Sequence, residues 1–238
     1  MYERVKRSNY AGEVVIITSR SRSDDPIADF CNKNKIPVFR GHLTDLLDRH
    51  YKAAKKYNAD VVVKIPSDCP LIDSTIIDRV IKFFLDNSGT YDFVSNLHPA
   101  SYPDGNDVEV MSFDAIERAW NAAVKDFERE HTTPYLWEHP EQFRIGNVEW
   151  ADGVDYSLTH RWTIDYEEDY IFIRSVFEEL YNEKPWFGMY DILELLKEKP
   201  YLNLINNKYI GRYWYENHMD SLKHIEQFKR KYRSVSNA

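Results

Sequence analysis

Short apolar runs rich in valine and isoleucine alternate along the chain with segments whose apolar residues recur at a helical period. The short runs are typical of strands and the longer segments of helices. The predicted strands are residues 13–19, 37–40, 60–65, 91–95, 107–111, 144–148 and 161–164. The predicted helices are the helix end at 1–8, then 24–35, 44–57, 74–86, 113–124, 128–138, 167–182 and 189–198. This alternation predicts an α/β fold with a mostly parallel sheet flanked by helices.

The strand at residues 60–65 reads DVVVKI, an apolar run without polar alternation. Such runs are typical of strands that are buried on both faces and paired on both edges. We therefore expect this strand to lie inside the sheet. Asp73 is expected to cap the helix that begins after it, and Thr44 the helix that reaches residue 57.

The net charge is −8, from 31 basic and 39 acidic residues. An acidic surface disfavours non-specific binding to nucleic acid or to anionic membranes. The two cysteines, Cys31 and Cys69, show no metal-site or redox spacing, which favours a reduced intracellular protein. No apolar stretch is long enough to span a membrane, and the first residues are too charged for a secretory signal. We expect a cytoplasmic protein.

Polar residues at the carboxyl ends of the predicted strands are the first candidates for chemistry, because ligands bind there in open parallel sheets. Asp68 and Asp165 follow two separate strands. Two such carboxylates suit a Mg²⁺ ion that also binds nucleotide phosphates. An aspartate at a strand end equally serves as a cap of the next helix, so position and residue type leave both interpretations open.

Other polar residues also allow two interpretations. Arg40 suits a phosphate or a base, and equally a surface ion pair. Glu130 and His131 lie in a polar segment that suits a substrate or plain solvation, and His131 could be an ordinary buried histidine. The segment 102–107 (YPDGND) is interpreted first as a turn and second as a loop that binds a ligand. The sequence contains no GxGxxG, GxxxxGK[ST], HExxH or GxSxG motif, and no DxD triplet stands at the predicted strand ends.

Several motifs in order resemble the family of spore-coat polysaccharide cytidylyltransferases, relatives of the acylneuraminate and deoxy-octulosonate cytidylyltransferases. They are IPVFRG, the run from TDLLDRHY to KIPSDCPLID, YPDGNDVEV, REHTTPYLWEHPEQFRIGNV and HRWTIDYEEDYIFIR. The resemblance covers about residues 1–200. It implies a Rossmann-like fold of the nucleotide-diphospho-sugar transferases. It also implies a reaction in which CTP and a sugar acid give a CMP-sugar and pyrophosphate.

The resemblance assigns roles to individual residues. It implies that Asp68 and Asp165 are catalytic and bind Mg²⁺, and that Ser19 and Arg40 contact the nucleotide. The residues implied to line the sugar side are Tyr102, Asp104, Asp107, Glu109, Glu130 and His131. CTP and a sugar acid are the implied partners, and a homodimer is compatible with the pattern. Lys64 and Pro66 stand where this family more usually has arginine and threonine.

Members of this family begin with a strand and a loop rich in glycine, arginine and lysine that holds the triphosphate, whereas here Met1 already lies in the helix that follows. The expectation is a sheet that lacks one strand between 13–19 and 60–65, and a chain with little activity. Residues 1–200 are expected to form the enzyme domain, and residues 201–238 a helical, aromatic extension that is either an appendage or a dimer element. Two rival functions remain: a GT-A glycosyltransferase that uses a nucleotide sugar, and a non-catalytic assembly subunit.

Overall fold

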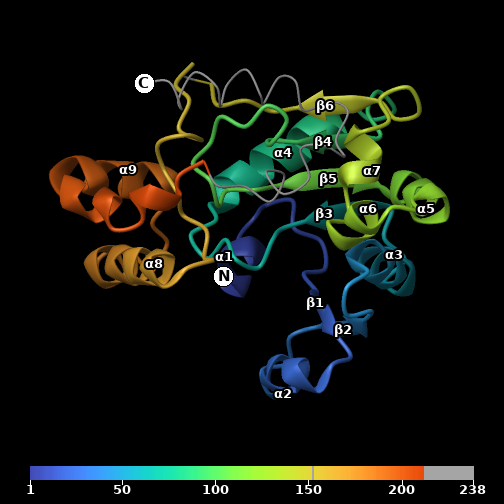
Figure 1. Ribbon diagram of the computed structural model, residues 1–238, viewed down its shortest axis with the longest axis horizontal. Helices are drawn as coiled ribbons and strands as arrows, with labels where there is room; N and C mark the ends of the chain where they lie inside the picture. Colours follow the sequence, from blue (N-terminus) through green and yellow to red (C-terminus); the bar gives the residue numbers. More distant parts are fainter. Residues whose placement is uncertain (152, 212–238) are drawn as a thin grey trace.

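Two β-sheets form the framework of the protein, as the computed structural model shows for residues 1–151 and 153–211 (Figure 1). The smaller sheet pairs β1 (Ile16–Ser19) with β2 (Val38–Gly41) in parallel. The larger sheet has the order β3-β5-β4-β6. Its strands are β3 (Val61–Lys64), β5 (Glu109–Ser112), β4 (Phe93–Ser95) and β6 (Ile145–Asn147).

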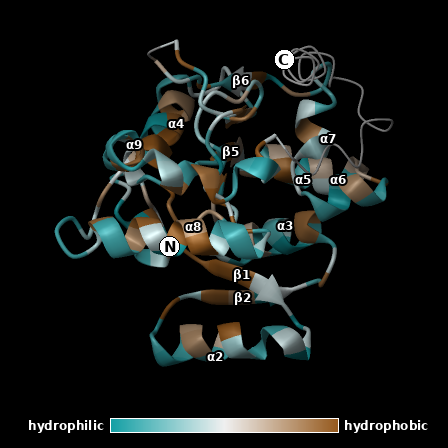
Figure 2. Cartoon of the chain, turned by 60° about the vertical axis from the view of Figure 1, so that its left-hand side comes forward, coloured by the Kyte–Doolittle hydropathy of each residue, from teal (hydrophilic) through white to brown (hydrophobic). Residues whose placement is uncertain are grey.

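Helices connect and cover these strands. They are α1 (Tyr2–Lys6), α2 (Asp25–Lys33), α3 (Leu46–Lys56), α4 (Ser74–Asp86), α5 (Phe113–Ala122), α6 (Asp126–Glu130), α7 (Pro134–Trp137), α8 (Glu167–Leu180) and α9 (Met189–Glu198). Short 3₁₀ turns lie at Arg22–Asp24, Pro200–Leu204 and Asn207–Tyr209. Figure 2 shows apolar colouring along β1 and β2, against which α2 packs at one end of the molecule. The α/β fold with helices on a sheet is confirmed.

The larger sheet has an apolar core on each face because side chains along a strand alternate between the two faces. Phe93 and Met111 contribute to one core, with residues of α3, α5 and α7. Val94 and Val110 contribute to the other core, with residues of α4, α8 and α9. The two cores hold the sheet at a fixed position between the helices.

The larger sheet is mixed, because β5 runs antiparallel to both β3 and β4, while β4 and β6 are parallel. The orientation of β5 could not be read from its own apolar pattern, which is the same in either direction. The antiparallel pairing of β5 with β3 places Glu109 directly opposite Lys64.

Three sequence-based expectations are corrected by the structure. The single helix expected at 128–138 is two short helices, because Thr132 has a positive φ of 74° and ends the first of them. Residues 161–164, all described, form one bridge from Arg161 to Asp104 instead of a strand. Asp45, and not Thr44, caps α3 by accepting a hydrogen bond from the Asp48 N–H at 2.8 Å.

Within the described residues, no helix is long and apolar enough to cross a membrane. The expected extension at 201–238 lies mostly outside the described residues, which end at residue 211. Before that point Asn206 is buried and donates to the Arg161 carbonyl oxygen at 2.9 Å and to Asp169 Oδ1 at 2.8 Å. Residues just after 200 are therefore tied to the core of the fold.

Candidate active site

A cavity of about 1020 Å³ opens between the two sheets. Its walls include both β1 and β3, the segment 65–68 that follows β3, and parts of the segment 96–109. The predicted site residues Asp68, Asp165, Tyr102, Asp104, Asp107, Glu109 and His131 all line it. The fold thus gathers in one cavity residues that lie far apart along the chain.

Hydrogen bonds to one backbone oxygen hold the segments of Asp68 and Asp165 side by side, just beyond the end of β3. The Ile164 N–H donates to the Asp68 carbonyl oxygen at 2.9 Å. The Thr163 hydroxyl donates to the same oxygen at 3.2 Å. The two aspartates therefore reach the cavity from adjacent backbone segments.

The loop 102–107 approaches the same place through Gly105. The Asp104 N–H donates to the His160 carbonyl oxygen at 3.0 Å, and the Trp162 N–H donates to the Asp104 carbonyl oxygen at 2.7 Å. Gly105 has a φ of +101°, and a Cβ at this position would lie 2.7 Å from the Trp162 carbonyl carbon and oxygen. Only glycine combines this backbone angle with so close an approach. The turn at Gly105 therefore packs closely against the segment that precedes Asp165.

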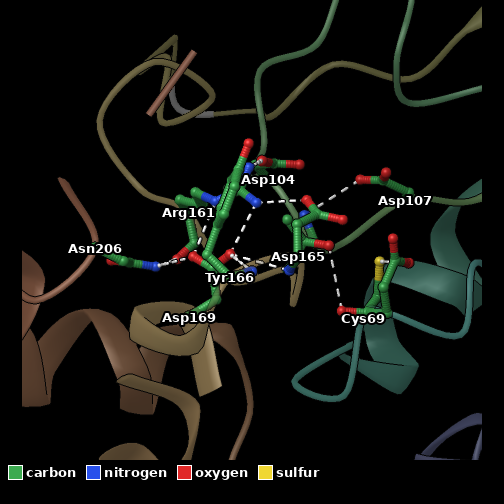
Figure 3. A network of polar contacts seen from close by, with 11 residues as sticks. Cys69, Asp104, Asp107, Arg161, Asp165, Tyr166, Asp169 and Asn206 are labelled. Atoms are coloured by element: carbon green, nitrogen blue, oxygen red, sulfur yellow. Dashed lines mark hydrogen bonds and ion pairs between the residues drawn. The ribbon is translucent and has the colours of Figure 1, made fainter. Parts of the chain in front are cut away.

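Arg161 is buried and holds three aspartates around its guanidinium group (Figure 3). Its Nη1 lies 3.3 Å from Asp104 Oδ2, its Nη2 lies 2.5 Å from Asp165 Oδ2, and it forms a two-nitrogen pair with Asp169 at 2.9 Å. Burial lowers the pKa of Arg161, but its hydrogen bonds with Asp169 and Asp165 raise that pKa above its ordinary value. Arg161 therefore stays charged and holds the carboxylate of Asp165, which lines the cavity.

Negative charge accumulates beside this arginine. Burial raises the pKa of Asp104 well above its ordinary value, and the carboxylate of Asp107 raises it further, although Arg161 opposes this. Burial and the nearby carboxylate of Asp68 raise the pKa of Asp107 to about 7. Carboxylates that repel one another in this way are a suitable environment for a cation.

A second polar cluster lines the same cavity and joins the predicted residue Glu109 to Lys64 and Thr133, which were not among the predicted site residues. Lys64 forms an ion pair with Glu109 on the neighbouring strand, and the Thr133 hydroxyl donates to Glu109 Oε1 at 2.5 Å. Burial raises the pKa of Glu109, but Lys64 and Thr133 outweigh burial and hold it below its ordinary value. Burial lowers the pKa of both His50 and His98 to about 4, so both rings are neutral at pH 7.

The remaining predicted residues lie elsewhere. Ser19 and Arg40 are outside the cavity lining, and Arg40 donates from Nε to the Ser19 carbonyl oxygen at 2.8 Å and pairs with Asp25 at 2.7 Å. Glu130 is exposed at the end of α6, also outside the lining. Their assignment to the nucleotide and the sugar stays a prediction.

The comparisons with known proteins agree with this geometry. A family model described as cytidylyltransferase matches residues 1–210. The uncharacterized protein MJ1063 of Methanocaldococcus jannaschii is 33% identical over 210 residues, which cover 87% of this chain and 82% of that protein. The spore coat polysaccharide biosynthesis protein SpsF of Bacillus subtilis is 29% identical over 188 residues, which cover 79% of this chain and 75% of that protein.

Two solved structures are similar as well. A cytidylyltransferase from Leptospira borgpetersenii has a TM-score of 0.80 and 33% identity, with 90% of this chain and 86% of that chain covered. A CMP:2-keto-3-deoxy-manno-octonic acid synthetase complexed with CTP has a TM-score of 0.55 and 12% identity, with 75% and 86% covered, and at that identity it shows the fold alone. The chain therefore belongs to the cytidylyltransferase family of nucleotidyltransferases.

Proposed function

We propose that the protein transfers the cytidylyl group of CTP to a sugar acid and releases pyrophosphate. A hydroxyl oxygen of the sugar forms a bond to the α-phosphorus, and the bond from that phosphorus to the β-phosphate oxygen breaks. The hydroxyl proton passes to solvent. The observation that carries the proposal is the convergence of Asp68 and Asp165 in one cavity of a chain from the cytidylyltransferase family.

We propose that Asp68 and Asp165 hold a Mg²⁺ ion. Burial first, and neighbouring carboxylates second, raise the pKa of Asp104 and Asp107. A cation bound at this end of the cavity would favour the charged form of both groups, which supports the proposal. Mg²⁺ commonly binds one or two protein carboxylates and completes its shell with water and phosphate. Bound there, the ion neutralises charge on the phosphates.

We propose that the sugar acid occupies the part of the cavity that Tyr102, Lys64 and Glu109 line. Tyr102 lines it, and among the described residues its buried hydroxyl has no hydrogen-bond partner, so it is available to a sugar hydroxyl. Lys64 supplies positive charge nearby, shared with Glu109. The similarity to a spore coat polysaccharide protein supports the further proposal that the product serves the synthesis of a surface polysaccharide.

The test is pyrophosphate release by the purified protein with CTP, Mg²⁺ and a panel of sugar acids, and with the other nucleoside triphosphates in place of CTP. We expect slow but measurable release with CTP and at least one sugar acid, in line with the little activity expected from the sequence. Asp68→Asn should reduce the rate at least a hundredfold while the circular dichroism spectrum of the folded protein stays the same, because it removes a carboxylate from the proposed metal site. The matched control is Asp86→Asn, an exposed aspartate at the end of α4, which should keep the full rate.

Two results would contradict the proposal. Equal rates for the wild type and Asp68→Asn would remove Asp68 from the metal site. Sugar transfer from a preformed nucleotide sugar, without pyrophosphate release from CTP, would identify a glycosyltransferase instead.

A further inference from the structure

Arg161 is held in place by its backbone as well as by its side chain. Its peptide segment forms a bridge with Asp104, and the Asn206 side chain donates to the Arg161 carbonyl oxygen at 2.9 Å. The Arg161 side chain is 1% exposed, and the Tyr166 ring lies over its guanidinium carbon, with the ring centroid at 5.6 Å (Figure 3). The guanidinium group therefore has a fixed position inside the protein.

Asp169 anchors this guanidinium group to the start of α8. Its fully buried carboxylate accepts from Nε and Nη2 of Arg161, each at 2.9 Å. The same carboxylate accepts from the backbone N–H groups of Asp165 and Tyr166, each at 3.0 Å. A buried ion pair with this many partners is costly to disturb. The pair of Arg161 and Asp169 is thus the rigid base of the arrangement.

The other two carboxylates that Arg161 holds belong to the cavity. Asp165 contacts Nη2 of Arg161 through Oδ2 alone, and its side chain is 52% exposed, which leaves Oδ1 for a cation. Asp104 contacts Nη1 through Oδ2 at 3.3 Å, and it lies in the loop that also carries Tyr102 of the proposed sugar site. One guanidinium group therefore joins a proposed metal ligand to the loop 102–107.

An arginine suits this task and a lysine does not. The guanidinium group presents its N–H donors in a rigid planar fork, and here Nε, Nη1 and Nη2 all reach carboxylates. An ammonium group has a single nitrogen on a flexible stem. Groups that hydrogen-bond a metal-binding carboxylate fix its orientation, and their loss typically weakens metal binding by about 10–100-fold.

We propose that Arg161 is a positioning residue that couples the loop 102–107 to the cation site at Asp165. It fixes Asp165 through one oxygen and leaves the other oxygen for the cation. Its contact with Asp104 makes the position of Asp165 depend on the loop. The inference rests on the cation of the proposed function, and it adds a residue that touches neither the cation nor the substrate.

The test measures the binding of Mn²⁺, a paramagnetic substitute for Mg²⁺, to the full chain by electron paramagnetic resonance, without substrate. Arg161→Lys keeps the charge but loses the fork. We expect it to weaken Mn²⁺ binding at least tenfold while the circular dichroism spectrum of the folded protein stays the same. Arg144→Lys is the matched control, because Arg144 forms the same kind of two-nitrogen pair with Asp92 outside the cavity lining. It should bind Mn²⁺ as the wild type does.

A double-mutant cycle tests the coupling itself. Asp104→Asn removes a carboxylate that is not a proposed metal ligand. We expect it to weaken Mn²⁺ binding about fivefold in the wild type and at most about twofold in Arg161→Lys, because the contact that transmits the change is then already lost. A direct effect of the Asp104 charge on the cation would be equal in both backgrounds.

A crystal structure of the wild type with Mn²⁺ tests the same contact without a variant, and it decides the question if Arg161→Lys does not fold. The anomalous signal of Mn²⁺ locates the ion. We expect the ion beside one oxygen of Asp165, with Arg161 still paired to the other oxygen.

Three outcomes would overturn the proposal. Equal or tighter Mn²⁺ binding in Arg161→Lys would show that Arg161 has no effect on the cation or competes with it. An equal effect of Asp104→Asn in both backgrounds would exclude the coupling. An ion bound with Asp165 turned away from Arg161 would exclude the positioning contact. In each case, weaker Mn²⁺ binding in Asp68→Asn and Asp165→Asn would leave the metal site of the proposed function standing, whereas Mn²⁺ binding that neither change weakens would overturn both proposals.

Discussion

The Asp107 carboxyl shows how one buried charge makes stability depend on pH. Its pKa in the folded protein is about 7, whereas an ordinary aspartate titrates at about 3.9. Between these values the folded state binds a proton that the unfolded state releases. The contribution of Asp107 to stability is therefore lost as pH rises through about 4 to 7.

Replacing Asp107 with asparagine should remove this dependence. We expect Asp107→Asn to raise the free energy of unfolding at pH 8 and to leave it nearly unchanged at pH 4. Urea unfolding across this range, in the presence of a chelator, measures the effect. Asp114→Asn, which changes an exposed aspartate in the first turn of α5, is the control. A variant that is less stable at pH 8 would contradict the raised pKa that burial and the Asp68 carboxylate give to Asp107.

Asp68 and Asp165 could be chosen from sequence as candidate site residues because each follows a predicted strand. The strand predicted before Asp165 is only a single bridge in the structure. The role of Arg161 could not be predicted from sequence. It depends on an ion pair with Asp104, which the turn at Gly105 brings close. Lys64 was noticed only as an unusual residue. Its pairing with Glu109 follows from the register of an antiparallel strand, which the apolar pattern does not contain.

At the scale of elements, a single side chain joins two helices. Asp73 caps α4 by accepting from the Thr75 N–H at 2.8 Å, and its other oxygen accepts from the Met189 N–H at 2.7 Å, at the start of α9. A Cβ on Gly188 would lie 2.5 Å from the same Asp73 oxygen, so the contact depends on glycine. The cap was predicted from sequence, but its second partner comes from far along the chain.

We expect Asp73→Ala to lower the free energy of unfolding by about 2–4 kcal/mol. The loss of a helix cap costs about 1 kcal/mol, and a buried N–H left without a partner adds about 1–3 kcal/mol. Chemical denaturation measures the change, and Asp86→Ala at the opposite, exposed end of α4 is the control. A loss no greater than that of the control would mean that water replaces both contacts.

The helices α4 and α9 have the bounds that sequence predicted, Ser74–Asp86 and Met189–Glu198, because each is long, periodic and capped. The predictions were wrong for elements that are short or interrupted. Pro134 suits the first turn of a helix, and it marks the restart after Thr132 that periodicity alone hides. The strand expected at 161–164 is replaced by one bridge because Gly105 brings a turn, and not a strand, alongside.

For the whole molecule, a cation bound among the carboxylates should act as a ligand of the folded state. Such a ligand stabilises by mass action, by about 2.7 kcal/mol at a hundred times its dissociation constant. We expect Mg²⁺ to raise the melting temperature of the wild type in a saturable way, and to do so much less in Asp165→Asn. Calorimetry at constant ionic strength separates this from general screening. An equal rise in both proteins would place the cation elsewhere.

The position of β5 also has a consequence for how the chain folds as it is synthesised. It lies between β3 and β4, both of which precede it in sequence, and neither of those strands pairs with the other. The ribosome thus releases β3 and β4 before the strand that joins them exists, and the larger sheet cannot form until residue 112 has emerged. Contacts between residues so distant in sequence form slowly. Until then the valines of β3 stay exposed, and this interval is when a nascent chain would most need a chaperone.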